Sequence, residues 1–349
     1  MSLVREMAMV FLRVTAIWLA ALWGLCGAAV AGPLEIRVAL QLPQGTPLYE
    51  SIANFKAEVE KQTGGAVAVS IFPGAQLYKP SEVRDAVGSG AIEMGASLLS
   101  EYVQAVPASD IFSLPFMFTS PELVRAATAP GSVIRSPVDE AILETTGARV
   151  LWWFPSGASI MVSKGAPVLT PAAIERKKVR VSGISLGEMV KLCGGIPVES
   201  GGDQQYELYK NGAVDIGMTT TSIIATRKLW EVMDTLAITN HVQTEFVLII
   251  NEKVWKSLPA DQQQIVASAA RASEQIFRQK ADLQAREAVV LAGQRGMHLA
   301  EVANSDVKKW KACAAPMLDT FLERSGTLGT KVMAGYRQIL VETYSMPSR

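Results

Sequence analysis

A weak internal duplication constrains the fold of this chain more than any other feature. The first copy alternates strand-like and helix-like patterns over residues 35–40, 47–62, 67–72, about 81–87 and 90–95. The second copy repeats the same order over residues 178–181, 186–192, 196–198, about 203–210 and 212–217. Two similar hexapeptides, Gly90-Ala-Ile-Glu-Met-Gly95 and Gly212-Ala-Val-Asp-Ile-Gly217, occupy the same place in each copy. The alternative is a coincidence between two ordinary βαβ units.

Each copy reads strand, helix, strand, helix, strand, which predicts a parallel sheet covered by helices. Two such units give an α/β protein with two lobes. Ligands of open parallel sheets bind beyond the carboxyl ends of the strands, so two facing lobes would place these ends on opposite walls of one cleft. The candidate walls are therefore residues 41–46, Ser97, 182–185 and 219–221.

Further segments connect and cover the two units. Hydrophobic strands near 150–154 and 244–251 are candidate crossovers between lobes. Residues 260–292 lack glycine and proline, which predicts either one helix long enough to span both lobes or two helices with an unmarked break. Amphipathic helices are expected over 307–322 and 329–344, the first split or kinked at Pro316. The expected organisation is lobe 1 over 32–153 plus about 245–285, and lobe 2 over 154–244 plus about 286–349.

The N-terminus indicates export. Residues 1–31 contain Arg5 and Arg13, an apolar run over 14–25 and the ending Ala29-Val-Ala31. This pattern predicts a secretory signal peptide cleaved after Ala31, and hence a periplasmic protein. A membrane anchor is the alternative, although the run is shorter than the roughly 20 apolar residues that span a bilayer.

Charge and rare residues exclude several classes of protein. Acidic and basic residues balance across the chain, so no electrostatic footprint for nucleic acid is present. His241 and His298 stand apart without a zinc-binding spacing, and neither a metal site nor a cofactor is expected. Cys193 and Cys313 either pair in an oxidising compartment or stay as buried free thiols.

Seven motifs in order resemble those of the solute-binding proteins of tripartite ATP-independent periplasmic (TRAP) transporters. They are Pro73-Gly-Ala-Gln-Leu77, the first hexapeptide, Leu114-Pro-Phe116, Lys178-Val-Arg-Val181, Gly212-Ala-Val-Asp215, Thr239-Asn-His241 and Asn251-x-x-Val-Trp255-x-x-Leu-Pro259. The resemblance implies a two-lobed periplasmic binding protein fold, in which each lobe is a mixed, mostly parallel sheet flanked by helices and a long helix spans both lobes. It also implies a monomeric receptor that captures a small organic acid and delivers it to a membrane permease. By the same resemblance, Arg180 grips the ligand carboxylate, a role that suits the paired donors of a guanidinium group.

The chain departs from the family pattern around this arginine. The resemblance places a second arginine of many members at Ser159 and an asparagine at Thr219. With one arginine and several hydroxyl groups, the pocket is expected to favour a monocarboxylate. Aromatic residues near the crossover either contact the ligand or form the hinge core. The predicted ligand-binding set is Arg180, Ser159, Thr219, Thr220, Ser97, Trp153, His241 and Phe116.

As a TRAP receptor, the protein is not expected to be an enzyme. Two other functions remain as alternatives. Gly183-Ile-Ser-Leu-Gly187 has the form of a hydrolase nucleophile elbow, with Ser185 as nucleophile. The remaining triad members would be Asp203 or Asp215 and His241 or His298. No oxyanion motif precedes this segment, and a strand–turn–helix rich in glycine also suits an anion-binding turn. The third class is a receptor for an ABC importer or a sensor kinase, which would share the lobed fold.

Overall fold

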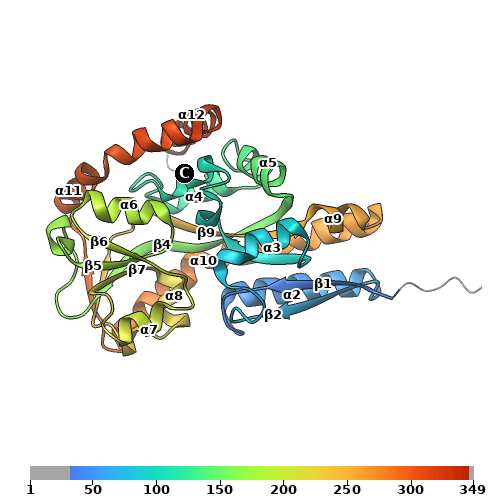
Figure 1. Cartoon of the computed structure of the whole chain (residues 1–349), viewed down its shortest axis with the longest axis horizontal. Coiled ribbons are helices and arrows are strands. Elements are labelled where there is room, and N and C mark those ends of the chain that lie inside the picture. Colours follow the sequence, from blue (N-terminus) through green and yellow to red (C-terminus); the bar gives the residue numbers. More distant parts are fainter. Residues whose placement is uncertain (1–31, 346–349) are drawn as a thin grey trace, which may run out of the picture. The chain divides into compact units, whose positions relative to one another are not determined.

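A computed structural model describes residues 32–345 of the chain, so the predicted signal peptide and its cleavage site lie outside the described residues. A mixed sheet runs through the protein in the strand order β2-β1-β3-β9-β4-β7-β5-β6 (Figure 1). β8 joins β4, and β10 joins β8. The strands are β1 (Leu34–Ala39), β2 (Val67–Phe72), β3 (Met94–Leu98), β4 (Ala148–Ser163), β5 (Lys178–Val181), β6 (Ile196–Glu199), β7 (Ile216–Thr220), β8 (Thr235–Ile238), β9 (Gln243–Asn251) and β10 (His298–Glu301).

The strand order shows that the two sequence copies form equivalent halves of the sheet. The first copy gives the order β2-β1-β3 and the second gives β6-β5-β7, with parallel pairing of β1 to β3 and of β5 to β6 and β7. β3 then pairs antiparallel to β9, and β7 pairs antiparallel to β4. The predicted α/β fold with mostly parallel lobes is therefore confirmed.

Each hexapeptide makes the same contacts in its own half of the sheet. The Glu93 carboxylate accepts the backbone N–H of Arg37 at 2.9 Å, and the Asp215 carboxylate accepts that of Lys178 at 2.8 Å. Both acids thus fasten the first strand of their own unit. The final glycines, Gly95 and Gly217, allow a helix to pack on the strand. A Cβ at Gly95 would lie 2.5 Å from Val83, and one at Gly217 would lie 1.9 Å from the Tyr209 hydroxyl. The likeness of the two motifs is therefore structural.

The third strand of each copy begins later than the sequence pattern predicts. Gly90 ends the preceding helix in the left-handed conformation, at a φ of 84°, and Gly212 has a φ of 64° at the same place in the second copy. Backbone bonds from Ala91 to Ala86 and from Ala213 to Leu208 complete these two helix ends. Because the first residues of each hexapeptide form a helix cap, the strands start only at Met94 and Ile216.

Helices cover both faces of the sheet. They are α2 (Pro47–Gln62), α3 (Val83–Ser89), α4 (Pro121–Thr128), α5 (Arg135–Thr146), α6 (Ile184–Leu192), α7 (Gln205–Lys210), α8 (Thr221–Thr226), α9 (Glu252–Ser257), α10 (Ala260–Gln294), α11 (Asn304–Ala314) and α12 (Pro316–Ser345). Short 3₁₀ turns are η1 (Pro80–Glu82), η2 (Leu99–Tyr102), η3 (Pro107–Ser113), η4 (Pro171–Ile174) and η5 (Leu229–Glu231). Within the described residues, no helix combines the length and the apolar character that crossing a membrane requires.

One continuous helix, α10, joins the two halves. Its 35 residues pack against α2 of the first copy, α8 of the second copy and the crossover strand β4 between them. The prediction of a single spanning helix is confirmed, and the alternative of two helices is wrong. The crossovers are confirmed as β4 and β9, which pair with each other through a register shift at Pro155–Gly157.

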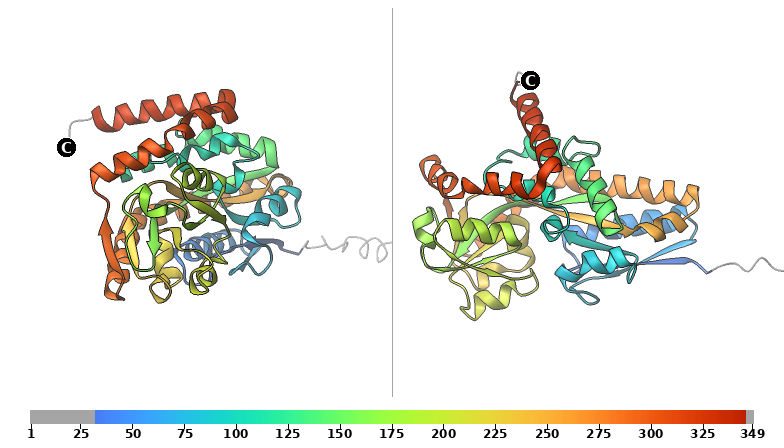
Figure 2. Two further views of the ribbon diagram at one scale, coloured as in Figure 1. Left: turned by 60° about the vertical axis from the view of Figure 1, so that its left-hand side comes forward. Right: turned by 45° about the horizontal axis from the view of Figure 1, so that its top comes forward.

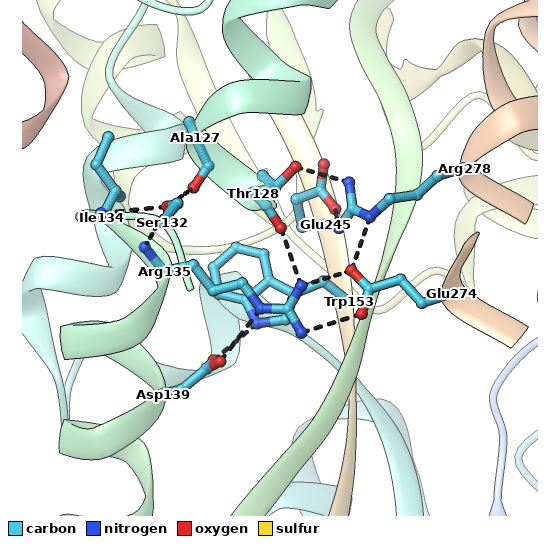
Figure 3. A network of polar contacts seen from close by, with 10 residues as sticks. All are labelled: Ala127, Thr128, Ser132, Ile134, Arg135, Asp139, Trp153, Glu245, Glu274 and Arg278. Carbon is cyan, nitrogen blue, oxygen red and sulfur yellow. Dashed lines mark hydrogen bonds and ion pairs between the residues drawn. The ribbon is translucent and has the colours of Figure 1, made fainter. Parts of the chain in front are cut away.

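A buried polar network fastens α10 to the first half of the sheet (Figure 3). Arg135 of α5 binds both carboxylate oxygens of Glu274 on α10, and its Nε lies 3.2 Å from Asp139. Arg278, one turn beyond Glu274, binds the same carboxylate at 2.8 Å. Glu245 of β9 lies 3.9 Å from Arg278, so the network reaches the crossover strand. Arg135 and Glu274 are thereby paired, as the burial of a charge in a protein interior requires.

The C-terminal segment is tied to the second copy and folds over the first. Cys193 at the end of α6 and Cys313 of α11 form a disulfide, which settles the open question of their pairing. Pro316 begins α12, and this confirms the predicted break. α12 packs on α4 and η3 and changes direction at Gly326, which has non-helical angles (Figure 2).

Candidate functional site

A cavity lies beyond the carboxyl ends of the parallel strands of both halves. Gln41 and Leu42 follow β1, Leu98 ends β3, Ser182 follows β5, and Thr220 ends β7. This is the position that open parallel sheets offer to ligands. The full lining is Gln41, Leu42, Leu98, Ser156, Ser159, Arg180, Ser182, Leu186, Gly202, Gln205, Met218, Thr219, Thr220, Ile223, Arg227, Thr244 and Phe246.

Arg180 of β5 is held rigidly in the wall of this cavity. Its Nε donates to Ser200 Oγ at 3.0 Å, Nη1 to the Met218 carbonyl at 2.9 Å and Nη2 to the Ser200 carbonyl at 2.7 Å. These bonds leave each terminal nitrogen one more N–H, a geometry that suits the two oxygens of a carboxylate. The side chain is 3 % exposed, and burial lowers the pKa of Arg180.

A second guanidinium group, that of Arg227, lines the same cavity. Arg227 follows the last turn of α8, and its Nε is buried without a hydrogen-bond partner among the described residues. Burial, and then the positive charge of Arg180, lower the pKa of Arg227 to about 10. Gly202 lies close to it, since a Cβ there would be 3.1 Å from Arg227 Nη2 and 3.0 Å from Gln41 Oε1.

The cavity therefore carries concentrated positive charge. Neither Arg180 nor Arg227 has an acidic partner within ion-pair distance in the part of the chain that the structure describes. Asp203 is exposed and acts on both arginines only as a more distant opposite charge. An anion that enters this space would relieve both the desolvation and the mutual repulsion of the two cations.

Hydroxyl groups and apolar side chains complete the walls. Ser156 and Thr220 hydroxyls lie 2.9 Å apart, and those of Ser159 and Thr244 lie 3.2 Å apart. Phe246 of β9 is the aromatic residue that lines the cavity. Such a surface can bind an anion at one part and pack against a carbon skeleton at another.

The structure brings four of the predicted site residues into this cavity, namely Arg180, Ser159, Thr219 and Thr220. Their contacts with a ligand remain predictions.

The other four predicted residues lie outside its lining. Ser97 is buried in β3, where its hydroxyl contacts the Leu98 carbonyl. Trp153 donates to Asp139 (Figure 3). It also packs edge-on against Phe112 in the core. Phe116 has a φ of 61° and donates its N–H to the His241 carbonyl at 2.6 Å. His241 is itself fully buried against Thr239, and burial lowers its pKa to about 3, so that its ring is neutral.

Arg227 is the residue that sequence reasoning missed. It follows Thr220 by seven residues, so two helical turns place it on the same side of α8 as Thr220. The only local signal is an arginine seven residues after a candidate strand, and this spacing does not show that its side chain approaches Arg180. The expected pocket with one arginine is corrected, because a second arginine comes from α8 rather than from the position of Ser159.

The hydrolase alternative is not supported. Ser185 lies in the first turn of α6 and is 3 % exposed, and its hydroxyl donates to Asp110. Neither histidine contacts it, since His241 Nδ1 bonds to the Thr239 hydroxyl and His298 belongs to β10. The residues of an acid–base–nucleophile chain are therefore not assembled around this serine.

Comparison with known proteins gives consistent matches. Residues 38–325 match the model of the DctP family, described as bacterial extracellular solute-binding proteins of family 7. The C4-dicarboxylate-binding periplasmic protein DctP of Rhodobacter capsulatus is 27 % identical over 85 % of this chain and 89 % of its own length.

Two solved structures share the fold. One is DctP7, a Bordetella pertussis extracytoplasmic solute receptor binding pyroglutamic acid, with a TM-score of 0.82 and 21 % identity over 87 % of this chain and 99 % of its own. The other is a TRAP periplasmic solute-binding protein from Chromohalobacter salexigens with bound D-glucuronate. Its TM-score is 0.81, and it is 24 % identical over 86 % of this chain and 99 % of its own. Because the family model covers most of the chain, this protein belongs to the DctP family of bacterial extracellular solute-binding proteins.

Proposed function

We propose that the protein is the periplasmic receptor of a TRAP transporter, which captures a small organic acid and delivers it to a membrane permease. In this proposal residues 1–31 are a signal peptide that is removed after Ala31. The two lobes comprise residues 32–153 with about 245–285, and 154–244 with about 286–349. The Cys193–Cys313 disulfide suits a protein that folds in an oxidising compartment.

One observation carries the proposal: two arginines that have no acidic partner among residues 32–345 line a cavity at the carboxyl ends of both sets of parallel strands. Burying unneutralised guanidinium groups is costly unless a ligand supplies the opposite charge. The three related proteins described above are named for dicarboxylates, pyroglutamic acid and glucuronate, all of which carry a carboxylate. We place the ligand carboxylate on the free N–H groups of Arg180.

Arg227 extends this assignment to the rest of the ligand. An acid with one carboxylate at Arg180 and a second acidic or strongly polar group near Arg227 would satisfy both cations. The expectation of a monocarboxylate depended on a single arginine, and the presence of Arg227 removes that ground. We therefore favour a dicarboxylate or a hydroxylated acid.

The experiment is a thermal-shift screen of organic acids followed by calorimetry on the wild type and Arg180→Ala. A ligand that binds only the folded state raises the melting temperature by linkage. We expect Arg180→Ala to weaken binding at least 10-fold, roughly the loss of a charge-assisted hydrogen bond. Its fold should remain intact by circular dichroism.

Arg271→Ala, which removes an exposed arginine of α10, is the matched control and should leave affinity unchanged. Unaltered affinity in Arg180→Ala would contradict the site assignment. A screen in which neutral sugars or amines bind and no acid does would contradict the ligand class.

A further inference from the structure

The serine of the Gly183-Ile-Ser-Leu-Gly187 motif has a partner outside the ligand cavity. Ser182 and Leu186 line the cavity, whereas Ser185 donates its hydroxyl to Asp110 Oδ2. Successive residues of a helix point about 100° apart, so the first turn of α6 turns one side to the cavity and another to Asp110. The same short segment therefore forms a cavity wall and carries an anchor.

Asp110 joins three elements that are far apart in the sequence. It belongs to η3, accepts the Ser185 hydroxyl of α6, and accepts Arg324 Nη2 of α12 at 2.8 Å on the same oxygen. Asp110 is 1 % exposed, and its other oxygen has no partner among the described residues. Burial raises the pKa of Asp110, and the serine hydroxyls and the Arg324 cation act in the opposite direction. The contacts from Ser185 and Arg324 thus favour the charged form of the buried Asp110 carboxylate.

The contact also connects the two halves of the sheet. η3 follows β3 of the first copy, whereas α6 lies between β5 and β6 of the second copy. At Gly183, which precedes α6, a Cβ would lie only 3.1 Å from the Cβ of Ser100 in η2, so η2 also approaches the start of α6 closely. Ser109 and Ser113, on either side of Asp110, face Ser182 and Leu186 across a smaller second cavity. A shift of α6 away from η3 would therefore move the wall of the ligand site.

We propose that Ser185, Asp110 and Arg324, here named the Asp110 clasp, are positioning residues for ligand binding. The clasp holds the Ser182–Leu186 wall against η3. Because Arg324 belongs to α12, the position of this wall also depends on the C-terminal helix. None of the three residues lines the ligand cavity. The inference rests on the proposed function, since it concerns how tightly the same cavity retains an organic acid.

The test compares the wild type with Ser185→Ala, Arg324→Gln, Arg324→Lys and the double variant Ser185→Ala/Arg324→Gln. The probe is whichever of succinate, D-glucuronate or L-pyroglutamate gives the largest thermal shift with the wild type. We expect each of Ser185→Ala and Arg324→Gln to raise Kd roughly 10-fold, mainly through faster dissociation, because a hydrogen bond to a buried charge is lost. Arg324→Lys should restore most of the affinity, since it keeps a cation that can donate to Asp110.

Because both residues act through one carboxylate, the double variant should weaken binding by less than the product of the two single effects. The matched controls are Arg337→Gln, an exposed arginine on the same helix, and Ser136→Ala, an exposed serine in the first turn of α5. Both should bind like the wild type.

The outcomes separate this inference from the proposed function. If Ser185→Ala and Arg324→Gln lower the melting temperature of the unliganded protein but leave Kd and the dissociation rate unchanged, the clasp is only a structural contact and the inference is wrong. Equal loss of affinity in Arg324→Lys and Arg324→Gln would also overturn it. Absence of acid binding in the wild type would contradict the proposed function and remove the basis of the clasp with it.

Discussion

Arg180 and Arg227 differ in how the protein supports them. Arg180 is fixed by three hydrogen bonds, one to Met218 of β7 and two to Ser200 after β6. The buried Nε of Arg227, by contrast, has no partner among the described residues. The first arginine is thus preorganised for a carboxylate, and preorganisation reduces the cost of ordering a side chain on binding. The second lies near the end of a short helix and is better suited to discriminate between ligands than to anchor all of them.

This difference predicts selective loss in Arg227→Gln. The change keeps hydrogen-bonding capacity and removes the charge, so the Kd of a dicarboxylate such as succinate should rise about 10-fold or more, whereas butyrate should be affected less. The unliganded protein should be no less stable, because the change removes a half-buried cation that has no acidic partner among the described residues. Calorimetry with both acids and a melting curve provide the readouts. Equal losses for succinate and butyrate would show that Arg227 does not meet the second acidic group.

At the scale of elements, the crossover strand β9 combines two tasks. Thr244 and Phe246 line the ligand cavity, and Glu245 between them belongs to the polar network around α10 (Figure 3). In a strand successive side chains point to opposite faces, which explains how one segment serves both. Glu245 pairs in register with Pro155, next to the irregular stretch of β4. The network and the cavity therefore meet next to one of the two register shifts between β4 and β9.

The Glu245 carboxyl should make stability depend on pH. Burial raises its pKa from 4.5 to about 7, Glu274 adds to this, and Arg278 and Arg135 oppose it. The folded state therefore holds this proton more tightly than the unfolded chain does. The resulting stabilisation is complete below about pH 4.5 and is lost as the pH rises through about 7.

Glu245→Gln should remove the loss of folding stability that the wild type shows as the pH rises through about 7. Relative to the wild type, the variant should gain stability between pH 5 and pH 8 by up to about 3 kcal/mol. The measurement is urea unfolding at several pH values, with the exposed Glu301→Gln as control. A difference between Glu245→Gln and the wild type that is constant with pH would contradict the assignment.

At the scale of the whole molecule, the C-terminal helices are joined to the sheet covalently and by packing. The disulfide links α6 to α11 across a sequence separation of 120 residues, with a Cα–Cα distance of 5.2 Å. From Pro316 onward α12 crosses to η3 and α4, so the tail of the chain contacts α6 of the second copy and segments that follow the first copy. The Asp110 clasp lies within this arrangement.

The length of the closed loop predicts a large contribution of the disulfide to stability. In the chain-entropy model, a loop of this size stabilises the folded state by about 5 kcal/mol. Cys193→Ala/Cys313→Ala should accordingly melt at a lower temperature than the wild type, and reduction should lower the wild-type melting temperature toward that of the variant. Thiol titration before and after reduction is the control. Two free thiols in the unreduced wild type would show that the bond does not form.

The sequence by itself determined the features that depend on local pattern. The helix from Pro47 to Gln62 follows from helical spacing and a threonine–proline start, and the long α10 follows from the absence of glycine and proline. Arg180 could be identified because it lies in a strand motif that resembles those of a known family. The duplicated hexapeptides located two equivalent units, because local capping and one carboxylate per unit impose the same structure twice.

Only the tertiary structure decided which side chains meet. Arg227 belongs to a short helix without a motif, and nothing local shows that it turns back toward Arg180. Trp153 and His241 lie in or next to the crossover strands in sequence, and Phe116 lies in the Leu-Pro-Phe motif, yet packing buries all three outside the cavity. The sequence around Ser185 resembles that of a nucleophile, but in the folded protein its hydroxyl donates to Asp110, 75 residues away. Periodicity and capping act over a few residues, whereas a binding site depends on contacts between distant segments that the packing of strands and helices brings together.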